Sequence, residues 1–153
     1  MNYIDLQIVT EISAYPELQQ FQQWVDAALS GREADAEIVI RLVDEQESGE
    51  LNQQYRHKPG PTNILSFPFE APPGIPLDLL GDLVICAPLI VQEAVQQNKV
   101  AEHHWAHITV HGVLHLLGYD HIEDPDAEQM EALEIDILKK LNIANPYLEE
   151  STQ

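Results

Sequence analysis

The sequence predicts a single domain, residues 1–153, in which a four-stranded β-sheet packs against about five α-helices. Three observations lead to this fold class. The chain has 153 residues, a length at which one domain buries a substantial core, and 44% of them are hydrophobic. Hydrophobic residues alternate in some segments, as in strands, and recur at helical spacing in others. No internal repeat or linker divides the chain.

The N-terminal part predicts two strands joined by a helix. Residues 3–9 and 36–43 carry hydrophobic residues at every second position, which is typical of half-buried strands, and we expect these two to pair. Between them, helical spacing begins after Pro16 and stops at Gly31. This segment is therefore predicted to be an amphipathic helix that packs on the core.

A shorter helix is predicted for residues 44–55. Asp44 and Glu47 form the pattern of a capping box, which marks the start of a helix. The hydrophobic spacing that follows leads us to expect Leu51 and Tyr55 to face inward.

The rest of the chain predicts two strands and three helices. The strands at residues 63–67 and 81–86 flank a proline-rich surface excursion at 68–80. After Asp82 the second of these strands is hydrophobic throughout, so we expect it in the centre of the sheet. The three helices span about residues 88–98, 100–117 and 124–141. The middle one is hydrophobic nearly all round, as a buried helix is.

The composition limits what the protein can be. The 26 acidic residues against 7 basic ones give a formal net charge of −19, which disfavours a general nucleic-acid binder. The densest basic spot is Arg56-His57-Lys58, a local patch that suits a polyanion. Cys86 is the single cysteine, which excludes an internal disulfide and fits a reducing compartment. Neither a membrane span nor a secretion signal is evident, so we expect a cytoplasmic protein.

The strongest functional signal is the stretch from His111 to His121. On a helix, His111 and His115 lie one turn apart on the same face, so their imidazoles can converge on one ion. Gly118 can end the helix in a left-handed conformation, and the turn can return His121 as a third ligand. Three imidazoles with an open position are typical of a catalytic zinc site. The spacing H-x3-H-x2-G-x2-H is that of metzincin-type zinc hydrolases.

Other residues of this helix leave alternatives open. Gly112 stands where those proteases carry their glutamate base, which argues against a protease and would leave room beside the metal. His107 could replace His121 as the third ligand. We favour a core or supporting role for His107, because three imidazoles spread over two turns do not easily close around one ion at about 2.1 Å. His103 and His104 are expected to face solvent near the helix start.

Four segments together resemble the bacterial YbeY endoribonucleases. They are LNQQYR (51–56), PTNILSFP (61–68), GDLVI (81–85) and HGVLHLLGYDH (111–121). The resemblance covers most of the chain from Val43 onward. It implies an α+β fold with a mixed four-stranded sheet, about five helices and a tris-histidine metal site at the end of the buried helix. It also implies a metal-dependent, single-strand-specific endoribonuclease of ribosomal RNA maturation, notably at the small-subunit rRNA 3′ end, and of ribosome quality control.

The same resemblance implies site residues and partners. The three metal ligands of the family correspond to His111, His115 and His121, which would hold one divalent ion, with zinc preferred. The functional arginine of the family corresponds to Arg56, and Lys58 stands where a basic substrate-binding residue is expected. The implied partners are single-stranded or ribosomal RNA and the ribosome or its proteins, without a membrane.

The chemistry of these residues predicts how such a site would work. We expect Arg56 to hold the scissile phosphate through two hydrogen bonds, beside a metal that stabilises the developing charge. Asp82 either orients a ligand or loop, or is only a turn residue at a strand end. Two other functions stay open at this point: a metalloprotease-like hydrolase, and a non-catalytic ribosome assembly factor with a structural metal.

Overall fold

The computed structural model describes residues 2–31, 36–69, 74, 79–119 and 124–147. These ranges contain every strand and helix that the sequence predicts, with ends that differ by a few residues. Their order is β1 (Tyr3–Ile8), α1 (Leu18–Leu29), β2 (Glu37–Val43), α2 (Glu45–Arg56), β3 (Ile64–Pro68), β4 (Leu79–Cys86), α3 (Ala87–Gln96), α4 (Ala101–Leu116) and α5 (Asp124–Lys140). No helix in the described ranges has both the length and the hydrophobicity needed to cross a membrane.

The four strands form one mixed sheet in the order β1-β2-β4-β3. β1, β2 and β4 run parallel, and β3 runs antiparallel to β4 at the edge. The predicted pairing of the first two strands and the central place of β4 are both confirmed. Residues 83–86 of β4 are all buried, as their continuous hydrophobic sequence requires. Most of the predicted proline-rich excursion between β3 and β4 lies outside the described residues.

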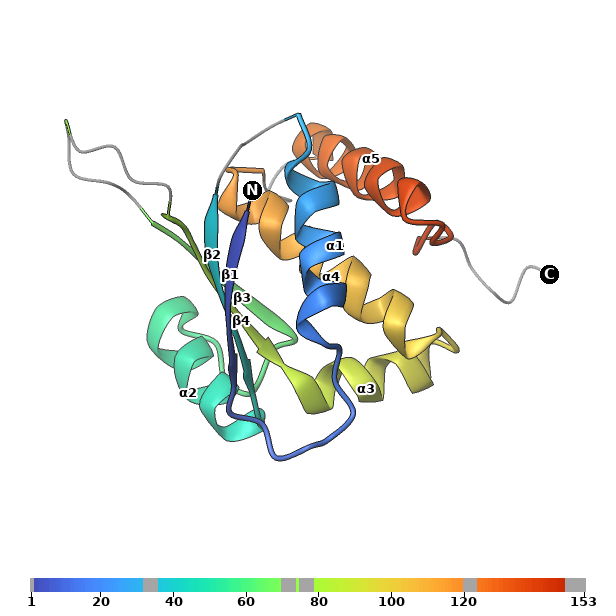
Figure 1. The fold of residues 1–153 in the computed structure, drawn as a ribbon. Helices are drawn as coiled ribbons and strands as arrows, with labels where there is room; N and C mark the ends of the chain where they lie inside the picture. The colour runs from blue at the N-terminus through green and yellow to red at the C-terminus, as the bar shows by residue number, and fades with distance from the viewer. Residues whose placement is uncertain (1, 32–35, 70–73, 75–78, 120–123, 148–153) are drawn as a thin grey trace.

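Helices cover both faces of this sheet (Figure 1). α2 lies on one face, α1, α3 and α4 lie on the other, and α5 packs outside them against α4 and α1. α4 contacts α1, α3 and α5 as well as β3 and β4, so it occupies the middle of the domain. Its sequence explains this position, because hydrophobic residues occur on nearly all of its sides and most of its residues are buried. The predicted α+β domain is confirmed.

α4 approaches the sheet closely at Gly112. A Cβ added to Gly112 would lie 2.5 Å from Cδ1 of Ile64 and 2.9 Å from Cδ2 of Leu83. The absence of a side chain therefore lets the helix pack directly on β3 and β4. The interpretation that Gly112 leaves room beside the metal is wrong, since this position faces the sheet.

Two expectations about α2 are also wrong. Tyr55 does not face inward: it is 57% exposed, and its ring packs edge-on against Phe67 with the ring centroids 5.1 Å apart. The helix begins after Asp44 as predicted, but the Asp44 side chain does not cap it. Instead, the Asp44 carboxylate accepts a hydrogen bond from the Thr10 hydroxyl, and Glu47 forms an ion pair with the arginine of β2. Asp44 thus ties the start of α2 to the segment that follows β1, and Glu47 ties α2 to β2.

Candidate metal centre

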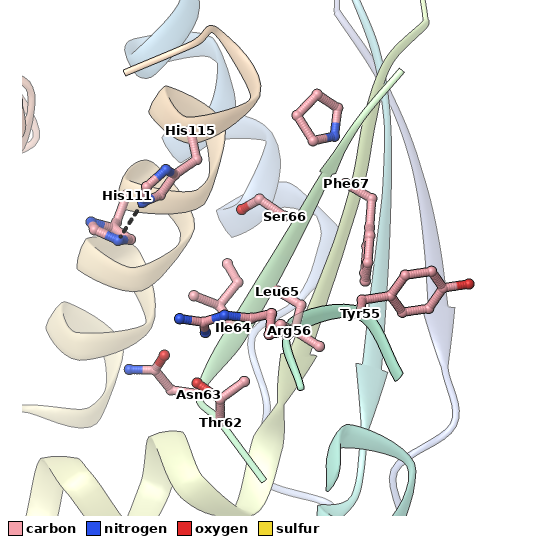
Figure 2. Close-up of a pocket in the computed structure, with 11 residues that line it drawn as sticks. Tyr55, Arg56, Thr62, Asn63, Ile64, Leu65, Ser66, Phe67, His111 and His115 are labelled. Carbon is pink, nitrogen blue, oxygen red and sulfur yellow. Dashed lines mark hydrogen bonds between the residues drawn. The ribbon is translucent and has the colours of Figure 1, made fainter. Parts of the chain in front are cut away.

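His111 and His115 lie one turn apart on α4 and face each other. Their Nε2 atoms are 3.1 Å apart (Figure 2). Two ligands of one tetrahedral ion, each about 2.1 Å from it, stand roughly 3.4 Å apart, so the observed separation is close to that of two ligands of one ion. Both side chains are partly exposed and line a pocket of about 750 Å³. The predicted convergence of these two imidazoles is confirmed.

The end of α4 has the geometry that the motif predicts. Gly118 follows the helix with a φ of 103°, a conformation that favours glycine. The predicted third ligand, His121, lies outside the described residues. Within the described ranges, no third histidine, cysteine or carboxylate completes a metal-binding group with His111 and His115. The ligand set therefore stays a prediction.

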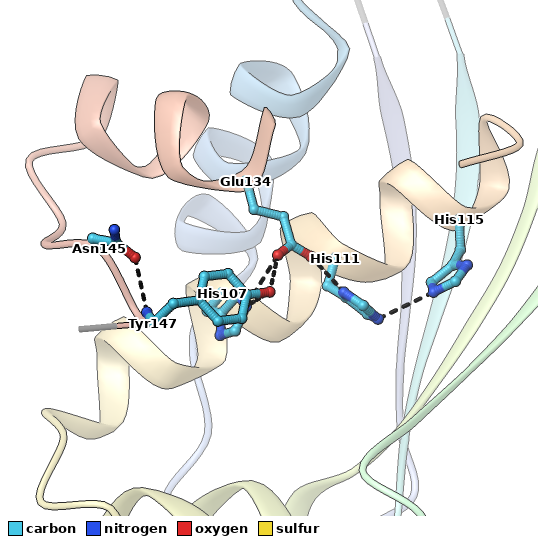
Figure 3. A network of polar contacts seen from close by, with 6 residues as sticks. All are labelled: His107, His111, His115, Glu134, Asn145 and Tyr147. Carbon is cyan, nitrogen blue, oxygen red and sulfur yellow. Dashed lines mark hydrogen bonds and ion pairs between the residues drawn. The ribbon is translucent and has the colours of Figure 1, made fainter. Parts of the chain in front are cut away.

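A buried carboxylate of α5 orients His111. Glu134 is fully buried, and its Oε1 accepts a hydrogen bond from Nδ1–H of His111 (Figure 3). With the proton on Nδ1, the neutral ring directs the lone pair of Nε2 toward His115. Histidines that bind metals usually donate their other ring N–H to a carboxylate in this way, which fixes the ring and raises the basicity of the ligand.

Sequence reasoning missed Glu134. The signal that could have found it is an acidic residue inside the hydrophobic stripe of α5. Met130, Ile137 and Leu138 surround position 134 at helical spacing, and all three are buried. A carboxylate is almost never fully buried unless it is paired, so an acid at this position predicts a partner on the neighbouring helix.

Two further side chains complete the contacts of Glu134. The Tyr147 hydroxyl donates to Oε2 of Glu134, and Nε2 of His107 lies 3.3 Å from the Tyr147 oxygen and 3.5 Å from Oε2 (Figure 3). Burial raises the pKa of Glu134, but hydrogen bonds from His107, His111 and Tyr147 outweigh it and lower the pKa to about 2. Burial and the carboxylate raise the pKa of Tyr147, and burial lowers the pKa of His107. His107 thus supports the carboxylate and does not face the two converging imidazoles.

Arg56 lies across the pocket from the histidines. It is the last residue of α2, and Figure 2 shows its guanidinium on the side of β3 that faces α4. Arg56 is exposed, and no described carboxylate pairs with it, although the chain has 26 acidic residues. None of the described residues that line the pocket is acidic. The pocket therefore combines one guanidinium and two imidazoles, which suits a phosphate.

The other predicted residues in the described part of the chain do not line the pocket. Lys58 is exposed beyond the end of α2 and does not line the pocket. Asp82 is exposed on β4. Its neighbour Leu83 packs under α4, and successive side chains of a strand point to opposite faces, so Asp82 points to the α2 side of the sheet and does not reach the described histidines. The expectation that His104 faces solvent is wrong. Its exposed fraction is 3%, and its Nε2 donates to Glu93 at 2.8 Å. His103 is partly exposed.

Known proteins match the chain over nearly its whole length. The family model described as Endoribonuclease YbeY matches residues 5–142. A curated protein of Colwellia psychrerythraea (strain 34H), named Endoribonuclease YbeY, is 55% identical over 151 residues, which cover 96% of this chain and 97% of the relative. The solution structure of a Thermotoga maritima protein has a similar fold, with a TM-score of 0.57, 24% identity, and coverage of 94% of this chain and 99% of that one. The resemblance of the sequence motifs is thereby confirmed, and the chain belongs to the YbeY family of endoribonucleases.

Proposed function

We propose that the protein is a metal-dependent endoribonuclease that cleaves single-stranded RNA in the cytoplasm. Its substrates would be ribosomal RNA, notably the 3′ end of the small-subunit rRNA, and RNA of defective ribosomes, with the ribosome or its proteins as partners. Family membership supports the reaction class. One observation carries the proposal for this chain: Arg56 has no described carboxylate partner and lines the same pocket as two converging imidazoles.

The donor set fits one divalent ion. His111 and His115 would bind it through Nε2, and His121 would be the third ligand. The Nε2 separation of 3.1 Å and the hydrogen bond from Nδ1 of His111 to Glu134 both support this assignment. Neutral imidazoles suit zinc, and also nickel, copper and iron, and we prefer zinc because an open tris-histidine site is typical of catalytic zinc.

The residues of the pocket divide the work of phosphodiester cleavage. When bound, the ion would supply Lewis acidity toward a phosphate oxygen and water. Arg56 would bind non-bridging oxygens of the scissile phosphate and hold the strand in place. Ser66 supports the wall of the pocket that β3 forms. Its hydroxyl donates to the Gly112 carbonyl at 3.3 Å and so ties β3 to α4. The absence of acidic side chains among the described lining residues keeps repulsion of the RNA low.

Two alanine variants test this assignment. His115→Ala and Arg56→Ala should both abolish cleavage of single-stranded RNA, but only His115→Ala should lose stoichiometric metal. Elemental analysis of protein purified without a polyhistidine tag measures the metal. Arg56→Lys serves as a matched control, since it keeps the charge but not the two-pronged geometry and should recover only part of the activity. Unchanged metal content in His115→Ala would contradict the ligand assignment, and full cleavage by Arg56→Ala would contradict the phosphate site.

A further inference from the structure

Asn63 lies on the pocket wall with Arg56, immediately before β3. Its backbone is fixed, because its carbonyl accepts a hydrogen bond from Cys86 N–H at 2.9 Å. Its side chain is partly exposed and lines the pocket. Figure 2 shows the Asn63 amide and the Arg56 guanidinium on the same side of β3, both toward α4.

Glu93 of α3 decides which atom of the Asn63 amide faces the pocket. Nδ2 of Asn63 lies 3.3 Å and 3.5 Å from the two Glu93 oxygens. A carboxylate only accepts hydrogen bonds, so the amide must turn its NH₂ group to Glu93 and its carbonyl oxygen, Oδ1, away from it. No donor in the described part of the chain reaches Oδ1. Oδ1 is therefore a fixed acceptor at the pocket that the fold does not satisfy.

His104 in turn holds Glu93. Its Nε2 donates to Glu93 at 2.8 Å, while its Nδ1 is buried and has no hydrogen-bond partner among the described residues. Burial raises the pKa of Glu93, but hydrogen bonds from His104 and Asn63 outweigh this and lower it. Glu93 thus stays an acceptor at neutral pH.

We propose that Oδ1 of Asn63 accepts a hydrogen bond from a ribose 2′-hydroxyl beside the phosphate that Arg56 binds, and that Glu93 is the positioning residue for this contact. The inference rests on the proposed function. A 2′-hydroxyl is the sugar donor next to each phosphate of RNA, and DNA lacks it. The amino and imino N–H groups of the bases are also donors, but they differ from one nucleotide to the next, whereas a 2′-hydroxyl is present at every position. Asn63 would therefore discriminate RNA from DNA.

The test compares RNA with DNA of the same sequence on the metal-loaded protein. KM is measured for a single-stranded RNA, and Ki for the matching single-stranded DNA as a competitor. Asn63→Leu should raise KM on the order of tenfold, the loss of about one hydrogen bond, and leave the Ki of DNA unchanged. Glu93→Gln should raise KM less, because a neutral amide lets Asn63 turn either way, and should also leave the Ki of DNA unchanged.

Each other outcome decides against the contact. Equal rises of KM and Ki in Asn63→Leu would show a general effect on the pocket, and a rise confined to RNAs with one kind of base would show a base contact. If the wild type cleaves RNA and Arg56→Ala does not, an unchanged KM of Asn63→Leu for RNA would overturn this inference but not the proposed function. A wild type that neither binds nor cleaves RNA would overturn the inference together with the proposed function.

Discussion

His111 and His104 of helix α4 each donate a hydrogen bond to a carboxylate of a neighbouring helix, and they do so through opposite ring nitrogens. His111 donates from Nδ1 to Glu134 of α5, whereas His104 donates from Nε2 to Glu93 of α3. In the first pair, the remaining nitrogen of the ring is directed at His115. In the second pair, the remaining nitrogen is buried without a described partner. The same two residue types therefore direct one imidazole at another toward one end of α4 and form an internal anchor toward the other.

The two pairs also differ in which residue is buried: the carboxylate in the first pair and the imidazole in the second. The Glu134 side chain is 0% exposed and that of His111 19%, whereas Glu93 is 26% exposed and His104 4%. Each pair thus has one buried member and one partly exposed member. The partly exposed member decides what the pair orients: an imidazole toward His115 in one case, and a carboxylate toward the Asn63 amide in the other.

The largest effect is expected for Glu134→Ala. This change leaves the donors of His111, His107 and Tyr147 facing a buried cavity without an acceptor. Breaking a buried charged network of this kind typically costs about 3–5 kcal/mol of unfolding free energy, which urea denaturation measures. Glu134→Gln keeps the shape and one acceptor, so it should fold. It should nevertheless bind zinc about 10–100-fold more weakly, as a competition titration with a chromophoric chelator would show.

Glu93→Gln is the matched control for zinc binding, because it makes the same chemical change in the other pair. Its zinc affinity should equal that of the wild type, since His104 contacts Glu93 and is not among the predicted metal ligands. Equal losses of zinc affinity in the two glutamine variants would show that both act through general stability, and would contradict the distinction between the pairs.

A smaller loss of unfolding free energy is expected for Gly112→Ala. This change would shift α4 near His111 without altering Glu134 or Glu93. The added methyl would lie 2.5 Å from Cδ1 of Ile64, so the helix or the strand must move. Overpacking of this kind costs about 1–3 kcal/mol, less a gain of up to about 1 kcal/mol from the better helix former. Ile64→Val removes that Cδ1 atom but leaves the contact with Leu83 Cδ2 at 2.9 Å, so the double variant should recover part of the loss in urea denaturation. No recovery would contradict the contact with Ile64 as the cause.

Tyr147→Phe should have a modest effect on the first pair only. It removes one donor from Glu134 but leaves the hydrogen bond from His111 in place. The expected loss is about 1 kcal/mol of unfolding free energy, with a smaller loss of zinc affinity than in Glu134→Gln. A zinc affinity as low as that of Glu134→Gln would mean that the tyrosine, and not the carboxylate alone, fixes the imidazole.

The smallest effect is a pH dependence of the second pair. In the folded state, hydrogen bonds from His104 and Asn63 outweigh burial and lower the pKa of Glu93, and the charge of Lys99 adds to this. A carboxyl group with a lowered folded pKa contributes stability that is present above its unfolded pKa, about 4.3, and is lost as the pH falls through the folded value. The stability difference between the wild type and Glu93→Gln should therefore be constant above about pH 6 and shrink below the unfolded pKa. A difference that grows in acid would contradict the sign of the shift.

The sequence by itself determined the elements, the sheet centre and the pair of converging histidines. These features depend on local periodicity, because hydrophobic spacing defines each strand and helix, and four residues of a helix always bring two side chains to one face. For the same reason, His111, His115 and the positive φ of Gly118 could be predicted without any knowledge of the packing.

Only the tertiary structure decided what surrounds those histidines. Glu134 is 23 residues from His111 in the chain, and Glu93 is 30 residues from Asn63, so no local pattern joins them. The roles of Gly112 and His104 were predicted wrongly, because each depends on which neighbour α4 meets: the sheet at Gly112, and α3 at His104. A side chain's own sequence position fixes its face on a helix, but packing between elements fixes what that face touches, and therefore which imidazole can serve a metal and which one cannot.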